Sequence, residues 1–266
     1  LTISVTRLEQ LSPALLELGC PARVYIPLEE VSRLESLPGE GPEWCAVLPR
    51  VWRDRDESAL RTLLEWARAL GFTGVLIGNL GHLPLVRGLD FHLYGDYGLN
   101  VFNSRSLAYL KDKELESACV SFELRFAQIR DLKKVLRAEA IVYGRLPLMI
   151  TENCLVQNET GCRLDRQGPC VPEDGPCRCG QPNVLVDRTG AAFPLLPAYG
   201  HRTEIQNSKP LYLADRPEHR RLGLAYARLR FTTETAEECV SVVQNYLDAA
   251  PAAGDFTRGL YERGVE

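Results

Sequence analysis

Short runs of strand-forming residues alternate along this chain with longer segments that have helical spacing. Such alternation is typical of βα units arranged around a parallel sheet. The predicted strands are Ile3–Thr6, Arg23–Pro27, Cys45–Pro49, Gly74–Gly78, His92–Val101, Cys119–Glu123, Ile141–Gly144 and Ala227–Phe231. They number eight, and eight parallel strands suit a closed barrel. The alternation therefore predicts an α/β fold, a (β/α)8 TIM-like barrel.

Helical periodicity is clearest in three segments between these strands. Apolar residues share one face over Glu57–Leu70, and Gly71 is expected to end that helix. Similar spacing predicts helices over Phe126–Leu136 and Glu238–Leu247. Thr235, three residues before Glu238, predicts a capping box at the start of the last one.

The pattern breaks for about eighty residues between the seventh and eighth strands, far more than a usual βα connection. We therefore expect a cysteine-rich insertion at 146–215 and a barrel formed by 1–145 and 216–266. Within the insertion, strand-like residues 184–186 and 192–196 flank the turn Asp187–Gly190, which predicts a hairpin.

Composition narrows the class of protein. The chain has 266 residues, of which 45% are hydrophobic, enough for one large core. It has no apolar run of 18 residues and no signal-peptide pattern, so we expect a cytoplasmic protein without membrane association. A net charge of −4 gives no general basic surface for nucleic acid. Because the chain starts at Leu1 without Met, we expect it to be part of a longer polypeptide whose N-terminal half is a partner.

Five of the nine cysteines lie within a polar, Gly- and Pro-rich segment, where burial in a core does not explain them. These are Cys154, Cys162, Cys170, Cys177 and Cys179. Several thiolates on a flexible loop can converge on a soft metal ion or an iron-sulfur cluster. The spacing is not that of a zinc ribbon. The alternative is a vestigial or disulfide-forming loop.

A plausible metal-ligand set is Cys154, Cys162 and Cys179, with Cys177 or Cys170 competing. His201 is a candidate fourth donor, and three thiolates with one imidazole would suit zinc. The remaining cysteines lie in apolar or helical segments and are interpreted as inert thiols: Cys20, Cys45, Cys119 and Cys239.

Barrel enzymes place reactive groups where strands end and βα loops begin. Polar residues at these positions are Asn79, Asn100, Asn103, Glu123 and Arg145. Glu123 is a candidate general base and Arg145 a candidate clamp for a carboxylate or phosphate. Each has an equally good structural explanation: an ion pair for Glu123, and support of the insertion for Arg145. Asn100 and Asn103 complete the predicted catalytic set.

Peptidase signatures are absent: the chain contains neither His-Glu-x-x-His nor Gly-x-Ser-x-Gly. His82 and His92 are interpreted as hydrogen-bonded structural residues, while a nucleophilic pair of Cys154 and His201 stays open. Basic residues suited to RNA occur in three places, which surface helix faces explain equally well: residues 216–221, Arg228 with Arg230, and Arg130 with Lys133 and Lys134.

Several motifs resemble collagenase-like peptidase family U32, most closely the C-terminal barrel of long bacterial members. They are Tyr143-Gly-Arg-Leu-Pro-Leu-Met-Ile-Thr-Glu-Asn-Cys154, Asn207-Ser-Lys-Pro-Leu211, Phe256-Thr-Arg-Gly-Leu260, Gly78-Asn-Leu-Gly81 and Asp96-Tyr-Gly-Leu-Asn100. The resemblance spans essentially the whole chain. It implies a barrel fold and a peptidase label. It also implies a kinship with members that hydroxylate RNA bases or ubiquinone precursors using an iron-sulfur cluster.

In the family pattern four cysteines hold the cluster, and the cluster ligands predicted in this chain are Cys154, Cys162, Cys177 and Cys179. His201 stands where the family has its last cysteine, a change that alters cluster charge or shifts the site toward zinc. The leading hypothesis is an iron-sulfur or metal-dependent bacterial protein that hydroxylates RNA. The alternatives are a metal-dependent collagenase-like peptidase and a non-catalytic scaffold barrel of a longer enzyme.

Overall fold

The computed structural model describes residues 1–19, 21–160 and 178–264. The chain folds as two compact units. The first comprises Leu1–Gly144 and Leu211–Glu266, and the second comprises Arg145–Pro210. Among the described helices, none is long and apolar enough to span a membrane.

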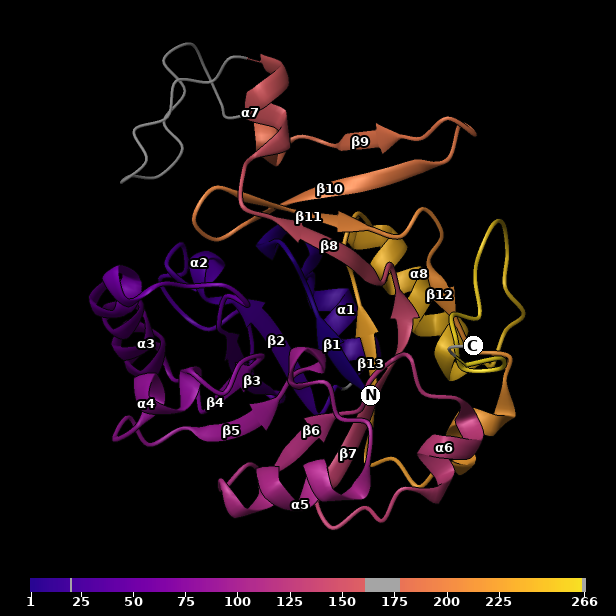
Figure 1. The fold of residues 1–266 in the computed structure, drawn as a ribbon, viewed down its shortest axis with the longest axis horizontal. Helices are drawn as coiled ribbons and strands as arrows, with labels where there is room; N and C mark the ends of the chain where they lie inside the picture. Colours follow the sequence, from indigo (N-terminus) through magenta and orange to yellow (C-terminus); the bar gives the residue numbers. More distant parts are fainter. Residues whose placement is uncertain (20, 161–177, 265–266) are drawn as a thin grey trace. The chain divides into compact units, whose positions relative to one another are not determined.

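Eight parallel strands close a barrel in the first unit (Figure 1). They are β1 (Thr2–Ser4), β2 (Arg23–Pro27), β3 (Glu43–Val47), β4 (Gly74–Ile77), β5 (His92–Gly95), β6 (Ser117–Cys119), β7 (Arg137–Gly144) and β13 (Tyr226–Arg230). Each pairs with the next along the chain, and β13 joins β7 to β1. The predicted (β/α)8 barrel is therefore confirmed.

Helices connect these strands. They are α1 (Pro13–Gly19), α2 (Leu28–Val31), α3 (Glu57–Leu70), α4 (His82–Val86), α5 (Ser104–Asp112), α6 (Phe126–Asp131) and α8 (Ala236–Leu247), with 3-10 turns η1 (Leu8–Gln10), η2 (Asp54–Asp56), η3 (Tyr97–Leu99) and η5 (Pro217–Arg221). As predicted, Gly71 ends α3 in the left-handed region with φ 102°, and Thr235 with Glu238 forms a capping box on α8.

Helix α6 is shorter than the predicted Phe126–Leu136. Leu132 is extended, and the Lys133 N–H donates to Ser104 Oγ (2.8 Å) instead of to a helical carbonyl. The chain then enters β7 at Arg137. Ser104, from the preceding βα unit, thus helps to end α6 at Asp131, although the helical spacing of apolar residues continues to Leu136 in the sequence.

The predicted strand His92–Val101 is also interrupted, because β5 ends at Gly95 and the chain turns through η3. A Cβ at Gly98 would lie 2.5 Å from the Gly78 carbonyl oxygen, so the turn packs directly against the end of β4. Val101 then forms an isolated bridge to Val120. The result is an irregular loop at the carboxyl ends of β4 and β5.

The two-residue strand β12 (Leu211–Tyr212) pairs antiparallel with the end of β7 and lies in the first unit. The sequence had placed residues 211–215 in the insertion. Both residues are buried, and Tyr212 packs 5.6 Å, centroid to centroid, from Tyr246 of α8. Aromatic packing therefore holds this segment against the barrel.

The second unit is an antiparallel sheet of four strands in the order β8-β11-β10-β9. Its elements are β8 (Pro147–Thr151), α7 (Leu155–Thr160), η4 (Arg178–Gly180), β9 (Asn183–Val186), β10 (Ala192–Ala198) and β11 (Arg202–Gln206). The predicted hairpin is confirmed, since β9 and β10 pair across the turn at Asp187–Gly190. Figure 1 shows β9 as the outermost strand of this sheet.

Candidate functional site

A buried ionic network occupies the inside of the barrel. Arg228 of β13 donates from Nη1 to Asp96 Oδ1 (2.5 Å), and from Nε and Nη2 to Glu139 Oε2 of β7. Thr2 Oγ1 donates to Glu139 Oε1 (2.5 Å), and the Tyr25 hydroxyl lies 3.3 Å from the same oxygen. Burial opposes the charge on Arg228, but its two carboxylate partners outweigh burial and raise the pKa of the guanidinium.

A second polar layer lies toward the amino ends of the strands. Arg23 of β2 donates to Glu43 Oε2 (2.9 Å), to the Tyr25 hydroxyl (3.1 Å) and to Ser117 Oγ (3.2 Å). The Tyr94 hydroxyl donates to Glu43 Oε1 (2.6 Å). Side chains from β2, β3, β5, β6, β7 and β13 thus fill the interior in layers. As in other barrels of this type, the interior is a packed core, and chemistry belongs at the carboxyl ends of the strands.

At those carboxyl ends, two arginines approach one aromatic ring. The Arg50 guanidinium carbon lies 5.2 Å from the Tyr97 ring centroid, and that of Arg230 lies 6.0 Å from it. Tyr97 packs against Phe122, which follows β6, at 5.7 Å. Guanidinium groups beside aromatic rings suit anionic ligands with a planar group. This cluster, Arg50 with Arg230, Tyr97 and Phe122, is the arginine-tyrosine cluster of the barrel.

The sequence predicts only one member of this cluster, Arg230, as part of a basic patch for RNA with Arg228. That prediction is wrong for Arg228, because its side chain lies inside the barrel and is only 1% exposed. Arg50 directly follows the predicted strand Cys45–Pro49 and lies three residues after the end of β3, and this position is a signal that could have identified it. The sequence does not identify Tyr97 as a site residue, because it predicts a continuous strand over His92–Val101.

The predicted catalytic asparagines are exposed loop residues. Asn103 caps helix α5, because its Oδ1 accepts hydrogen bonds from the backbone N–H of Arg105 (3.0 Å) and Ser106 (2.9 Å). Asn100 has a left-handed backbone with φ 53° after η3. Asn79 accepts from the Gly81 N–H (2.8 Å). Local turn and cap geometry accounts for these three residues, and their catalytic role stays a prediction.

Glu123 and Arg145, the other two predicted catalytic residues, belong to different units. Glu123 is half-buried in the loop between β6 and α6. Arg145 opens the second unit and donates from Nη1 to the backbone carbonyls of Asn207 (3.1 Å) and Ser208. Arg145 thereby ties the first residue of that unit to its last segment.

The second unit brings together two of the predicted ligand cysteines. Cys154 and Cys179 pack into one apolar cluster with Val156, Leu195 and Ile205. Cys154 is buried and Cys179 is half-buried. Helix α7, which follows Cys154, packs against η4, which carries Cys179. Two cysteines separated by 24 intervening positions, 155–178, are thus held in the same small core.

The remaining predicted ligands are not placed together by the structure. Cys162, Cys170 and Cys177 lie outside the described residues. His201 is half-buried in the turn between β10 and β11, with φ 59°. Within the ranges that the structure describes, no three His, Cys, Asp or Glu side chains are arranged to hold a metal. The complete ligand set therefore stays a prediction.

The other cysteines and histidines are structural. Cys45, Cys119 and Cys239 are buried, as predicted, and burial raises the pKa of each thiol, to about 12 for Cys239. Cys20 lies outside the described residues. His82 is buried with Nε2 3.1 Å from the Pro49 carbonyl, and burial lowers its pKa to about 4. His92 contacts Glu116, which raises its pKa. No cysteine-histidine nucleophile forms among these residues.

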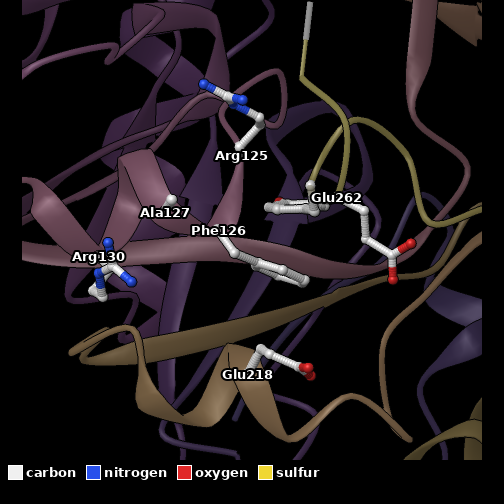
Figure 2. Close-up of a pocket in the computed structure, with 7 residues that line it drawn as sticks. Arg125, Phe126, Ala127, Arg130, Glu218 and Glu262 are labelled. Atoms are coloured by element: carbon white, nitrogen blue, oxygen red, sulfur yellow. The ribbon is translucent and has the colours of Figure 1, made fainter.

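A separate hollow of about 470 Å³ lies on the outside of the first unit, between α6, η5 and the C-terminal segment. Phe126 and Tyr261 stack at its base with their ring centroids 5.3 Å apart. Figure 2 shows Arg130 and Glu262 on opposite sides of the Phe126 ring. Both are already paired, Arg130 with Asp131 and Glu262 with Arg216. Its lining residues include no cysteine, serine, threonine or histidine.

Comparison with known proteins gives one family match. The model of the family described as "Peptidase family U32" matches residues 37–183. A search of curated proteins finds no match.

Three solved structures share weak structural likeness. The U32 peptidase Mk0906 is 9% identical over 88% of this chain and 93% of its own, with a TM-score of 0.47. Thiamine phosphate pyrophosphorylase from Pyrococcus furiosus is 8% identical over 93% and 94%, with a TM-score of 0.41. The spore cortex-lytic enzyme SleL of Bacillus cereus is 6% identical over 92% and 74%, with a TM-score of 0.39.

Proposed function

Since the chain belongs to peptidase family U32, we propose that it is the barrel domain of a metal-dependent, RNA-hydroxylating enzyme whose metal is bound by thiolates. Cys154 and Cys179 are the described part of the ligand set, and an iron-sulfur cluster is the proposed cofactor, with zinc as the alternative. The hydroxylation chemistry rests on the family resemblance in the sequence. The proposed metal site rests on the positions of Cys154 and Cys179 in the second unit.

The observation that carries the proposal is the shared position of Cys154 and Cys179 in one apolar cluster. Soft metal ions and iron-sulfur clusters are held by thiolates, and an apolar surround limits water and tunes the bound group. The further cysteine ligands predicted for a cluster, Cys162 and Cys177, lie between these two cysteines in the sequence.

The donor chemistry fits both candidate metals. Two cysteines satisfy half of a four-ligand site, and the predicted remaining ligands are Cys162 and Cys177 for a cluster, or Cys162 and His201 for zinc. A cluster would supply one-electron transfer. The role of this chain's own residues is to hold the ligands in a small apolar core that β10, β11 and α7 build.

The arginine-tyrosine cluster would meet an anionic substrate through Arg50, its half-buried arginine. Arg230 and Tyr97 are buried beside it at the carboxyl ends of the barrel strands, and the Tyr97 ring centroid lies 5.2 Å from the Arg50 guanidinium carbon. RNA is recognised through its phosphates and through bases that stack on aromatic or guanidinium planes. A cysteine-nucleophile peptidase has less support in the barrel, because burial raises the pKa of the Cys119 and Cys239 thiols.

Metal analysis after anaerobic purification tests the metal site. We expect bound iron with inorganic sulfide, or bound zinc, in the unaltered protein, and loss of most of it in Cys154→Ser and Cys179→Ser. Cys239→Ser is the control, since Cys239 is a buried free thiol of the first unit, and this variant should keep its metal. Metal-free protein, or equal loss in the control, would refute the site.

The RNA activity needs a separate test, so that its failure is distinguishable from failure of the metal site. Deleting the full-length gene should remove a hydroxylated nucleoside, a gain of one oxygen in mass, from digested ribosomal or transfer RNA. Complementation with the Arg50→Ala variant should restore less of it than the unaltered gene. Unchanged nucleosides together with chelator-sensitive cleavage of gelatin would favour the peptidase alternative.

A further inference from the structure

Strand β9 is an edge strand with an unusually apolar composition. It pairs with β10 and, among the described residues, with no other strand. Three consecutive residues are largely exposed: Val184 is 55% exposed, Leu185 47% and Val186 58%. Successive side chains of a strand point to opposite faces, so both faces of β9 are open. Natural edge strands are commonly protected by charge, proline or bulges, and Val184–Val186 have none of these.

The hydrogen-bonding pattern of the hairpin shows which backbone groups face outward. The Asp187 N–H donates to the Ala191 carbonyl (3.0 Å), so Asp187 turns its backbone groups toward β10. Residues alternate between the two sides of a strand. Leu185 therefore also faces β10, in register with Phe193. The outward donors and acceptors on the free edge are those of Val184 and Val186.

We propose that β9 pairs antiparallel with β9 of a second copy of this chain, about a twofold axis at Leu185. In that register Val184 lies opposite Val186 of the second copy, and each such pair exchanges two N–H to O=C hydrogen bonds. Two apolar pairs and the two leucines then meet across the axis, and no like charges face each other. A sheet edge of this kind is completed by an added strand.

Neighbouring registers are poorer for reasons visible in the sequence. An axis at Val184 would set Val186 against Pro182, which has no N–H to donate. An axis at Val186 would set Val184 against Arg188, which lies in the hairpin turn. Only the axis at Leu185 gives every outward group of Val184 and Val186 a strand partner. The edge is thus self-complementary in one register.

Pairing also extends the apolar core of the second unit. Leu185 lies opposite Phe193, which packs against the cluster of Cys154 and Cys179. The leucine of the second copy would cover the same side of the sheet. A twofold pair would therefore join two four-stranded sheets and place apolar cover beside each cysteine cluster.

Solution mass, measured by light scattering across a range of concentrations, tests the pairing. The 29.8 kDa chain should approach twice that mass at high concentration. Val184→Pro should shift it to monomer, because it removes an outward N–H without removing a bond to β10. Val184→Thr keeps both the N–H and the branched side chain and should stay dimeric. Circular dichroism should show both variants folded.

Cross-linking tests the register. Leu185→Cys should form an intermolecular disulfide under mild oxidation, because non-hydrogen-bonded antiparallel pairs bring Cα atoms to about 4.5 Å. Val184→Cys should not, since its counterpart is offset by two residues. Peptide mass spectrometry distinguishes this bond from the native cysteines.

A monomer at all concentrations would overturn the proposal. So would a dimer that survives Val184→Pro, or one lost instead on Met149→Lys at the opposite edge strand β8, where Met149 is 57% exposed.

Discussion

Arg228 in the barrel and Arg202 in the sheet unit are almost equally buried, but their acidic partners differ in exposure. Arg228 pairs with Glu139 and Asp96, whose side chains are 1% and 7% exposed. Arg202 makes a two-point contact with Glu152, which is 57% exposed. The barrel charges are compensated by buried protein groups, whereas the Glu152 carboxylate stays in contact with water. The ion pairs of the barrel are shielded from water, and that of the sheet unit is not.

Apolar packing differs in the same way. Buried side chains extend through every strand of the barrel. The sheet unit has a small cluster centred on Cys154, Val156, Leu195 and Ile205, and its edge strands expose apolar residues. Small domains with weak cores commonly rely on a bound metal or on association. The contrast teaches that the first unit is stabilised by a large core of its own, while the second has a small core, so the proposed metal and the proposed strand pairing would matter most for its stability.

The largest expected effect comes from Arg228→Met, which leaves Glu139 and Asp96 buried without their cation. Breaking one partner of a buried ion pair costs about 3–5 kcal/mol. The free energy of unfolding, from urea denaturation followed by tryptophan fluorescence, should fall by that amount. A loss below about 1 kcal/mol, in the range of exposed pairs, would show that water reaches the network and that the barrel is not closed.

A pH effect of nearly this size is expected from His82 in the barrel. Its pKa is lowered to about 4 by burial, against about 6.5 in the unfolded chain. Below pH 6.5 the unfolded state binds the proton that the folded state excludes, so stability falls as pH drops from 6.5 to 4, by about 3 kcal/mol. His82→Gln keeps a donor for the Pro49 carbonyl but does not titrate. The unaltered protein should therefore lose more stability than the variant over this window; parallel curves would contradict the assignment.

Arg202→Met should have a smaller effect than Arg228→Met, because Glu152 remains solvated. The expected cost is about 1 kcal/mol. Hydrogen exchange of the β11 amides, measured by mass spectrometry, reports this loss of stability in the sheet unit itself. If the two substitutions prove equally costly, the distinction between a closed barrel and an open sheet fails.

Asn103→Ala removes the cap of α5 and should cost about 1 kcal/mol. Asn103→Ser keeps an acceptor for the N–H groups of Arg105 and Ser106 and should restore most of the loss. If RNA modification falls in both variants while stability recovers in the second, the predicted catalytic role gains over the structural one.

The barrel was predictable because periodicity reports burial directly. Each of the eight predicted strands overlaps a barrel strand, although β6 (Ser117–Cys119) shares only Cys119 with the predicted Cys119–Glu123. Helix α3 ends at Gly71 and α8 begins at the Thr235 capping box, as predicted. The errors arose from tertiary contacts: Ser104 Oγ ends α6 early, and the Gly98 approach to Gly78 breaks the fifth strand. Neither contact has a local sequence signal.

The candidate site was predictable only in parts. Cysteine clustering identified Cys154 and Cys179, because thiols in polar, Gly-rich sequence have few structural uses. The arginine-tyrosine cluster was not predicted, because Arg50, Tyr97 and Arg230 come from three segments far apart in the sequence that only the closed barrel brings together. The sequence also does not distinguish an arginine inside the barrel, such as Arg228, from one at the carboxyl end of the same strand, such as Arg230.

The most direct test of the account is hydrogen exchange, resolved by peptide, before and after metal removal with a chelator. If Cys154 and Cys179 hold a metal that stabilises the sheet unit, protection should fall by about tenfold or more in β10 and β11, equivalent to about 1.4 kcal/mol. The barrel strands should keep their protection. Unchanged exchange in β10 and β11, or an equal loss across the barrel, would contradict the account.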